Sequence, residues 1–196
     1  MITYTYDARR TAEAAAWLLT RRERSMTFLK LLKLMYMADR ESLRMRGAPI
    51  TGDAMVSMDR GPVLSRTYDL IKPRERDQAS PEPWDDYVRR PRAEGWVMEP
   101  LVSVQDGADP DEQFPSLSES DREILNRIDQ QFGEMTEDEL VDMVHELPEY
   151  EYPAGSSIPI DPARILAGLG KTSEQIESIA ADARDRTELH QMLGQR

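Results

Sequence analysis

The residues in this chain best suited to chemistry are its two histidines, His145 and His190, each of which has acidic neighbours. His145 stands near Asp142 and Glu146, and His190 stands near Glu188. A zinc site needs three or four ligands in a tetrahedral arrangement, and neither group has the spacing that places two histidines on one helix face. We therefore expect no metal site and no cofactor, and we interpret His145 as a side chain that packs or hydrogen-bonds at a helix end.

Motifs for a serine nucleophile or for phosphate binding are also missing. The chain has no Gly-x-Ser-x-Gly elbow, and the Gly-Ser-Ser sequence at 155–157 lacks a strand-to-helix context. The segment 168–172 ends in Gly-Lys-Thr, but Ile165 occupies the position of the first glycine of a phosphate-binding loop. We interpret this segment as the end of one helix followed by the start of the next.

Carboxylates gather in polar runs at 137–139 and at Glu146, Glu149 and Glu151. General acid-base catalysis needs a desolvated carboxyl group with a raised pKa, whereas these side chains are expected to face water. The run at 137–139 is explained by a helix N-terminus, which favours negative charge. Because the sequence contains no recognisable catalytic motif, it favours a binding protein over an enzyme.

Length and composition indicate one domain without disulfides. The chain has 196 residues, of which 39% are hydrophobic, and it contains no cysteine. This length allows a single sizeable core, and the lack of cysteine excludes disulfides and thiolate metal sites. No apolar run approaches the roughly 18 residues of a membrane span, so we expect a cytoplasmic protein without a membrane partner.

The formal net charge of -12 is unevenly distributed. Residues 1–92 hold 18 basic and 13 acidic side chains, whereas residues 93–196 hold 7 basic and 24 acidic ones. An acidic second half repels phosphate backbones and suits a basic protein partner, or it is simply a solvated surface. The basic first half leaves room for DNA contact, but no helix-turn-helix pattern supports it.

Hydrophobic periodicity predicts two helices in the first 47 residues. Asp7 is placed to cap a helix rich in alanine, and a second helix is expected from about Ser25 to a stop at Gly47. The apolar face of the second helix comprises Phe28, Leu31, Leu32, Met35 and Ala38. The opposite, polar face is expected to comprise Lys30, Lys33, Arg40, Glu41 and Arg44.

The stretch SMDRGPVLS at 57–65 changes the pattern. A short strand is expected over 54–58, between turn residues. Pro62 suits the first position of a helix because its fixed φ is already helical, and Gly61 would then be either the N-cap or a residue that allows a close backbone approach. We therefore predict that a helix starts at this Gly-Pro corner.

The rest of the chain predicts a loop, a helical hairpin and a helical tail. Residues 73–116 are rich in proline and are interpreted as a variable insert. Residues 95–104 are expected to add to the small sheet, with Pro100 limiting that strand to an edge or a bulge. Capping boxes at Ser120 with Glu123 and at Thr136 with Glu139 predict the hairpin. The expected fold is α+β and mostly helical, with a helical core and a small antiparallel sheet. We expect the domain to cover 1–160 and a C-terminal helical tail to cover 161–196, with an Asp161-Pro162 cap and a last helix from about Ser173 towards Met192.

The segment FLKLLKLMYMADRESLRMRGAPITGDAMVSMDRGPVLSRTYDLI resembles the Panacea domain of SocA-like antitoxins, a family also described as phage-associated. The shared elements, in order, are 30–39, Gly47, 49–53, 55–58, 61–63 and Tyr68. A second block over 117–153 resembles the helical hairpin of the family, with Leu140, His145 and Pro148 at its shared positions. In the family a tryptophan closely follows this proline, where this chain has Glu149 and Tyr150.

The resemblance implies an antitoxin that binds and neutralises a protein toxin encoded beside it, as in systems of phage defence. The alternative is a proteolytic adaptor that hands a bound protein to an energy-dependent protease or a chaperone, with residues 171–196 as a flexible tether. An enzyme with an unrecognised site is a third alternative. The residues expected to bind the partner are Tyr36, Asp39, Arg60, Gly61, Pro62, Tyr68 and His145. For Tyr36, core packing is the competing interpretation.

Overall fold

The computed structural model describes residues 1–21, 26–71, 83–89, 97–101 and 109–194. Helices predominate among these residues, and two small antiparallel sheets accompany them, which confirms the expected fold class. The helices are α1 (Ala8–Arg21), α2 (Phe28–Arg46), α3 (Ser65–Ile71), α4 (Trp84–Tyr87), α5 (Pro110–Gln113), α6 (Glu119–Phe132), α7 (Glu137–His145), α8 (Pro162–Gly168) and α9 (Ser173–Gly194). The strands are β1 (Met26–Thr27), β2 (Met55–Met58), β3 (Gly61–Leu64), β4 (Val88–Arg89), β5 (Val97–Pro100) and β6 (Ile158–Ile160).

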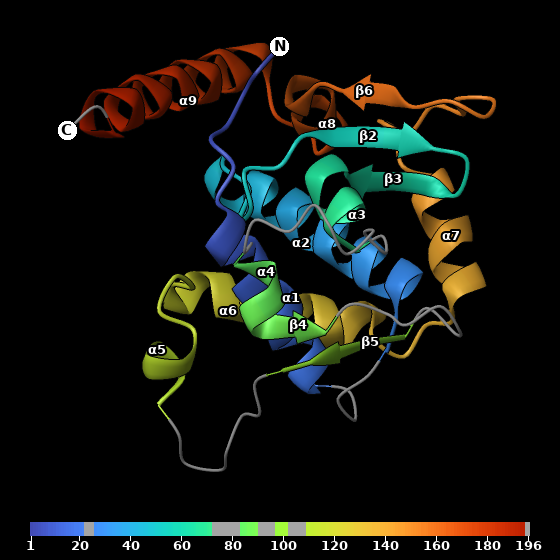
Figure 1. Cartoon of the computed structure of the whole chain (residues 1–196). Helices are drawn as coiled ribbons and strands as arrows, with labels where there is room; N and C mark the ends of the chain where they lie inside the picture. Colours follow the sequence, from blue (N-terminus) through green and yellow to red (C-terminus); the bar gives the residue numbers. More distant parts are fainter. Residues whose placement is uncertain (22–25, 72–82, 90–96, 102–108, 195–196) are drawn as a thin grey trace.

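Helix α2 is the centre of the core. It packs against α1, α6, α7 and β3, and Figure 1 shows it running through the middle of the molecule. It starts at Phe28 rather than near Ser25, because β1 occupies the two preceding residues and the Thr27 hydroxyl accepts the amide of Lys30. It ends as predicted at Gly47, which adopts a left-handed φ of 70°.

The first sheet has the strand order β3-β2-β6, and all pairs are antiparallel. A tight turn at Asp59 and Arg60 joins β2 to β3, with Met58 opposite Gly61. The prediction that a helix starts at Gly61-Pro62 is therefore wrong, since β3 occupies these residues and α3 begins at Ser65. Proline is tolerated here because β3 is an edge strand and the backbone polar groups of residue 62 point away from β2. The N–H that proline lacks would therefore have made no hydrogen bond to the neighbouring strand.

The second sheet has the strand order β1-β5-β4, and its strands β4 and β5 lie in the region predicted to be an insert. The strand expected within 95–104 is β5, but it joins this separate sheet rather than the one containing β2. It pairs with β1 on one side and β4 on the other, so the prediction of an edge strand is wrong. Residues 95–96 and 102–104 lie outside the described residues. The insert also contributes to the core, because Trp84 and Phe114 are fully buried. The Phe114 ring lies 5.3 Å from that of Trp17 in an edge-to-face contact.

The predicted helical hairpin is formed by α6 and α7. The predicted start is correct for α7 but too late for α6. The capping box of Thr136 and Glu139 begins α7, as expected. The box that begins α6 is Ser118 with Asp121, not Ser120 with Glu123. Asp121 is buried and pairs with Arg46 of α2, so this contact between helices favours the earlier start.

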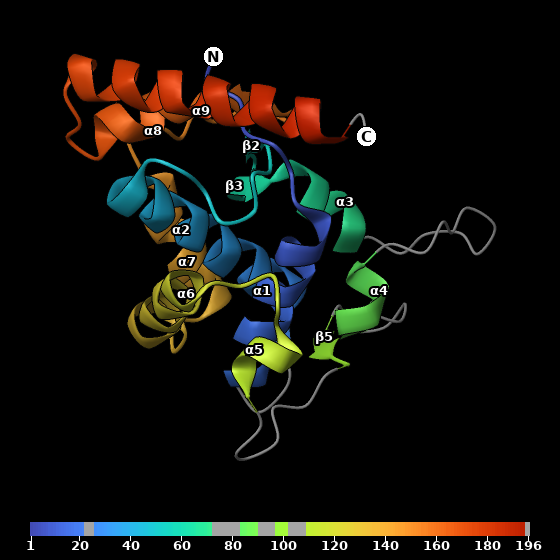
Figure 2. The same cartoon turned by 90° about the vertical axis from the view of Figure 1, so that its left-hand side faces the viewer.

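The C-terminal region lies along one side of the molecule, where α8 contacts α2 and α9. Asp161 caps α8 by accepting the Ala163 amide and also accepts the Ile2 amide at 3.2 Å, which ties the N-terminus to this region. The expected tail begins with fully buried side chains, Ile165 and Leu166 of α8. Figure 2 shows α9 lying lengthwise along this side of the molecule. None of the described helices is both long enough and apolar enough to cross a membrane.

Candidate functional site

The Gly-Pro corner borders a cavity of about 270 Å³, named the corner pocket below. Its walls come from the N-terminal half of α2, the β2–β3 turn, α3 and a loop at 155–156. Its lining includes Phe28, Leu29, Lys33, Arg60, Gly61 and Tyr68. The pocket therefore combines apolar walls with two basic side chains.

Gly61 is required where the corner meets α7. Its φ is +90°, and a Cβ atom at this position would lie 2.5 Å from Cγ2 of Val144. The same atom would lie 3.2 Å from Nζ of Lys33 and 3.4 Å from Cδ2 of His145. Glycine thus allows β3 to approach both α2 and α7 more closely than any other residue would.

Lys33 lies beneath the corner and is fully buried, so the prediction that it faces solvent is wrong. Its Nζ donates to the carbonyl oxygen of Pro62 at 3.0 Å, on the free edge of β3. Burial, together with the nearby charge of Arg60, lowers the pKa of Lys33 to about 7. The helical pattern of α2 predicts a solvent-facing position for Lys33, because the pattern does not record that β3 and α3 cover this face of the helix.

The turn before β2 is organised by two buried aspartates. Asp39 accepts the amides of Ile50 and Thr51 at 2.8 and 3.0 Å and the hydroxyl of Thr51. Burial raises the pKa of Asp39 to about 7, and the donated hydrogen bonds limit that rise. Asp53 accepts the amide and the hydroxyl of Thr67, both at 2.9 Å, and so caps α3 from a distant position. The two aspartates therefore fix the turn before β2 and the start of α3, the helix that contributes Tyr68 to the corner pocket.

A second buried group lies on the next turn of α2. The Tyr36 hydroxyl donates to Oε1 of Glu149 at 3.0 Å, and Nε of Arg40 donates to the same oxygen at 2.6 Å. Tyr36 and Glu149 are both fully buried. The prediction that Glu149 faces water is therefore wrong, because an arginine from α2 neutralises it inside the core.

His145 ends α7 behind Gly61. Its ring stacks on Tyr150 with 4.6 Å between centroids, and the Tyr150 hydroxyl donates to the Met58 carbonyl at 3.3 Å. The Nε2 atom of His145 is buried and has no hydrogen-bond partner among the described residues. Within the same part of the chain, no group of three or more His, Cys, Asp or Glu side chains could hold a metal ion.

The structure separates the predicted partner-binding residues into two groups. Arg60, Gly61 and Tyr68 line the corner pocket, and Pro62 and His145 pack behind it. Tyr36 and Asp39, by contrast, are fully buried, so neither is presented on this surface.

Sequence reasoning missed Lys33, Phe28 and the rim residue Ser156 as parts of the pocket. The one available signal was the position of Lys33 inside the apolar run of α2. Nothing local connected Ser156 to a turn almost a hundred residues earlier.

Among the comparisons with known proteins, one family model matches the chain. No curated protein and no solved structure matches the chain. A family model described as "Antitoxin SocA-like, Panacea domain" matches residues 31–150, which is more than half of the chain. This range includes most of α2, the β2–β3 hairpin, α3 and α7, so it covers most of the elements around the corner pocket. The chain therefore belongs to the family of SocA-like antitoxin domains, the Panacea domain family.

Proposed function

We propose that this protein is an antitoxin that neutralises a protein toxin by binding it directly, without catalysis. The observation that carries the proposal is the family match over residues 31–150. The corner pocket supports it because apolar cavities with a polar rim are where partners insert anchoring side chains.

The charges around the corner pocket favour a particular kind of toxin surface. Arg60 at the rim is already paired with Asp138 at 3.5 Å, and the Asp138 side chain is 91% exposed. Asp142 of α7 and Glu146, the residue that caps its C-terminus, are also exposed. We expect the toxin to place an apolar or aromatic anchor in the pocket, with basic residues beside it that face the acids of α7.

Co-expression tests the function itself. The product of the neighbouring open reading frame is expected to arrest growth when expressed alone, to be harmless with this protein, and to co-purify with it. A neighbour that is harmless alone, or that stays toxic in the presence of this folded protein, would contradict the antitoxin proposal.

A pair of variants tests the surface. Ser156 lies exposed at the rim of the corner pocket, and Ser157 is exposed beside it without lining the cavity. Ser156→Trp should fill the pocket and abolish co-purification, whereas Ser157→Trp should preserve it at an equal free energy of unfolding. Full neutralisation by a folded Ser156→Trp protein would show that the toxin binds elsewhere.

The adaptor alternative receives less support. The segment expected to be a flexible tether is helical from Ser173, and Ile176, Ile179 and Ala180 pack against the core. A Cβ atom at Gly47 would lie 2.9 Å from Ile179, which shows how closely α9 approaches α2. If deletion of 171–196 lengthens the lifetime of the bound toxin without weakening binding, the adaptor function gains support instead.

A further inference from the structure

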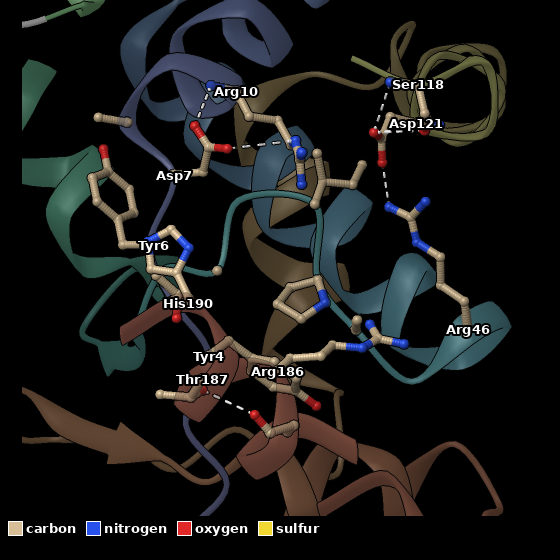
Figure 3. A pocket seen from close by; sticks show the side chains of 17 residues that line it. Tyr4, Tyr6, Asp7, Arg10, Arg46, Ser118, Asp121, Arg186, Thr187 and His190 are labelled. Carbon is tan, nitrogen blue, oxygen red and sulfur yellow. Dashed lines mark hydrogen bonds and ion pairs between the residues drawn. The ribbon is translucent and has the colours of Figure 1, made fainter. Parts of the chain in front are cut away.

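A second and larger cavity lies where α9 faces the N-terminal segment and the C-terminal end of α2. It has a volume of about 710 Å³, within the range of small-molecule sites, and is named the α9 cleft below. It shares no lining residue with the corner pocket. Figure 3 shows side chains from the N-terminal segment, α1, α2, α6 and α9 around it. Nothing in the proposed antitoxin function uses this cavity.

Three arginines from three helices line the α9 cleft, namely Arg10 of α1, Arg46 of α2 and Arg186 of α9. His190 of α9 adds a further group that can carry positive charge. Figure 3 shows Arg10 and Arg186 on opposite sides of the cleft and Arg46 between them at one end. The chain as a whole has a formal net charge of -12, so these basic side chains around one cavity stand out as a local site that would attract anions.

The two carboxylates that line the α9 cleft are already engaged. Asp121 pairs with Arg46 and also accepts the amide and the hydroxyl of Ser118, at 3.0 and 2.7 Å. Asp7 accepts the amide of Arg10 at 2.9 Å as the cap of α1, and its other oxygen lies 3.8 Å from Nε of Arg10. These aspartates hold arginines in place rather than filling the cleft.

Donors remain available in the cleft. Arg186 makes no ion pair or hydrogen bond with any described residue. Among the same residues, the Arg10 side chain donates a hydrogen bond only through Nε, to the Ser116 carbonyl at 2.9 Å. The guanidinium of Arg186 lies near enough to Tyr4 for its charge to act there: burial raises the pKa of Tyr4 to about 12, and this charge partly offsets the rise. Guanidinium groups with free terminal nitrogens match the oxygens of phosphates and carboxylates in bidentate geometry.

We propose that the α9 cleft binds a small organic oxyanion that carries two or more phosphate or carboxylate groups. One acidic group would lie against Arg186, and another would reach the terminal nitrogens of Arg10 across the cleft. Tyr4, Tyr6 and Pro49 would provide the walls for the carbon skeleton. Such a ligand would bridge α9 and α1, and it would therefore hold the C-terminal helix against the domain.

Calorimetric titration of the full chain with inorganic pyrophosphate and with citrate tests the proposal, with sodium chloride of equal ionic strength as the control. Saturable binding of pyrophosphate, citrate or both is expected, and the preferred probe identifies phosphate or carboxylate as the ligand chemistry. Arg186→Glu should weaken this binding by at least about tenfold, because it replaces a charge-assisted donor with a repelling carboxylate. Arg184→Glu is the matched control, since Arg184 is exposed on the same helix and does not line the cleft.

The outcomes separate this site from the proposed toxin site. Equal binding by the Arg186→Glu and Arg184→Glu proteins would overturn the proposal, as would heats that follow ionic strength alone. The same two variants should retain toxin neutralisation equally if the toxin uses the corner pocket. Loss of oxyanion binding with intact neutralisation would therefore leave the antitoxin function in place.

Discussion

Replacing Gly61 with alanine should destabilise the protein through two separable effects. The left-handed backbone at φ +90° costs a residue with a Cβ about 1–2 kcal/mol. The new Cβ would also lie 2.5 Å from Cγ2 of Val144, and such overpacking costs about 1–3 kcal/mol more. The sum is a loss of about 2–5 kcal/mol in the free energy of unfolding, measured by urea denaturation.

Gly155 provides the matched control for this experiment. Its φ is +84°, and nothing lies within 4 Å of a Cβ built on it, so Gly155→Ala should show the backbone cost alone. The Gly61→Ala protein should therefore lose about 1–3 kcal/mol more than the Gly155→Ala protein. Adding Val144→Ala should recover part of that difference as a favourable coupling energy. Equal losses at Gly61 and Gly155, or strict additivity with Val144→Ala, would refute the argument that α7 crowds the corner.

Three further predictions concern buried charge and capping. The pKa of Lys33 is about 7 in the folded protein and 10.5 in the unfolded chain, so below pH 7 the side chain is protonated in both states. Between about pH 7 and 10.5 only the unfolded chain holds this proton. The free energy of unfolding should therefore rise with pH across this window, by up to about 5 kcal/mol. Subtracting the pH profile of Lys33→Met should isolate this rise, and parallel profiles would contradict it. Arg40→Met should cost about 3–5 kcal/mol in urea denaturation by leaving Glu149 buried without its cation, and a second change, Glu149→Gln, should recover much of the loss. Thr136→Ala should lower the free energy of unfolding by about 1 kcal/mol through loss of the capping box; no change would mean that tertiary contacts alone hold the start of α7.

Several features of the fold were predictable because their determinants lie within a few residues. Gly47 ends α2, Thr136 with Glu139 begins α7, and Asp161 with Pro162 begins α8, as the local patterns indicated. Each cap satisfies backbone groups next to it in the chain, so no distant residue is needed to specify it. The order of the family-like elements was equally visible, since it depends on spacing alone.

The predictions that were wrong depend instead on distant residues, since each involves a partner far away in the chain. The sequence pattern places Lys33 in solvent because its partner, the Pro62 carbonyl, lies on a strand 29 residues later. It places Glu149 in solvent because the partner of this carboxylate, Arg40, lies 109 residues earlier. Likewise, the start of α6 depends on the contact of Asp121 with Arg46, 75 residues away.

The Gly-Pro corner shows most clearly what the sequence determines and what the tertiary structure determines. By itself the sequence determined that a break must occur at Gly61-Pro62, because glycine and proline restrict the backbone whatever surrounds them. Only the tertiary structure decided that the break is an edge strand between α2 and α7 and not a helix start, because Lys33, Val144 and His145 surround it from other elements. The corner pocket and the α9 cleft follow the same rule: cavities are made by the packing of distant segments, and no local pattern records them.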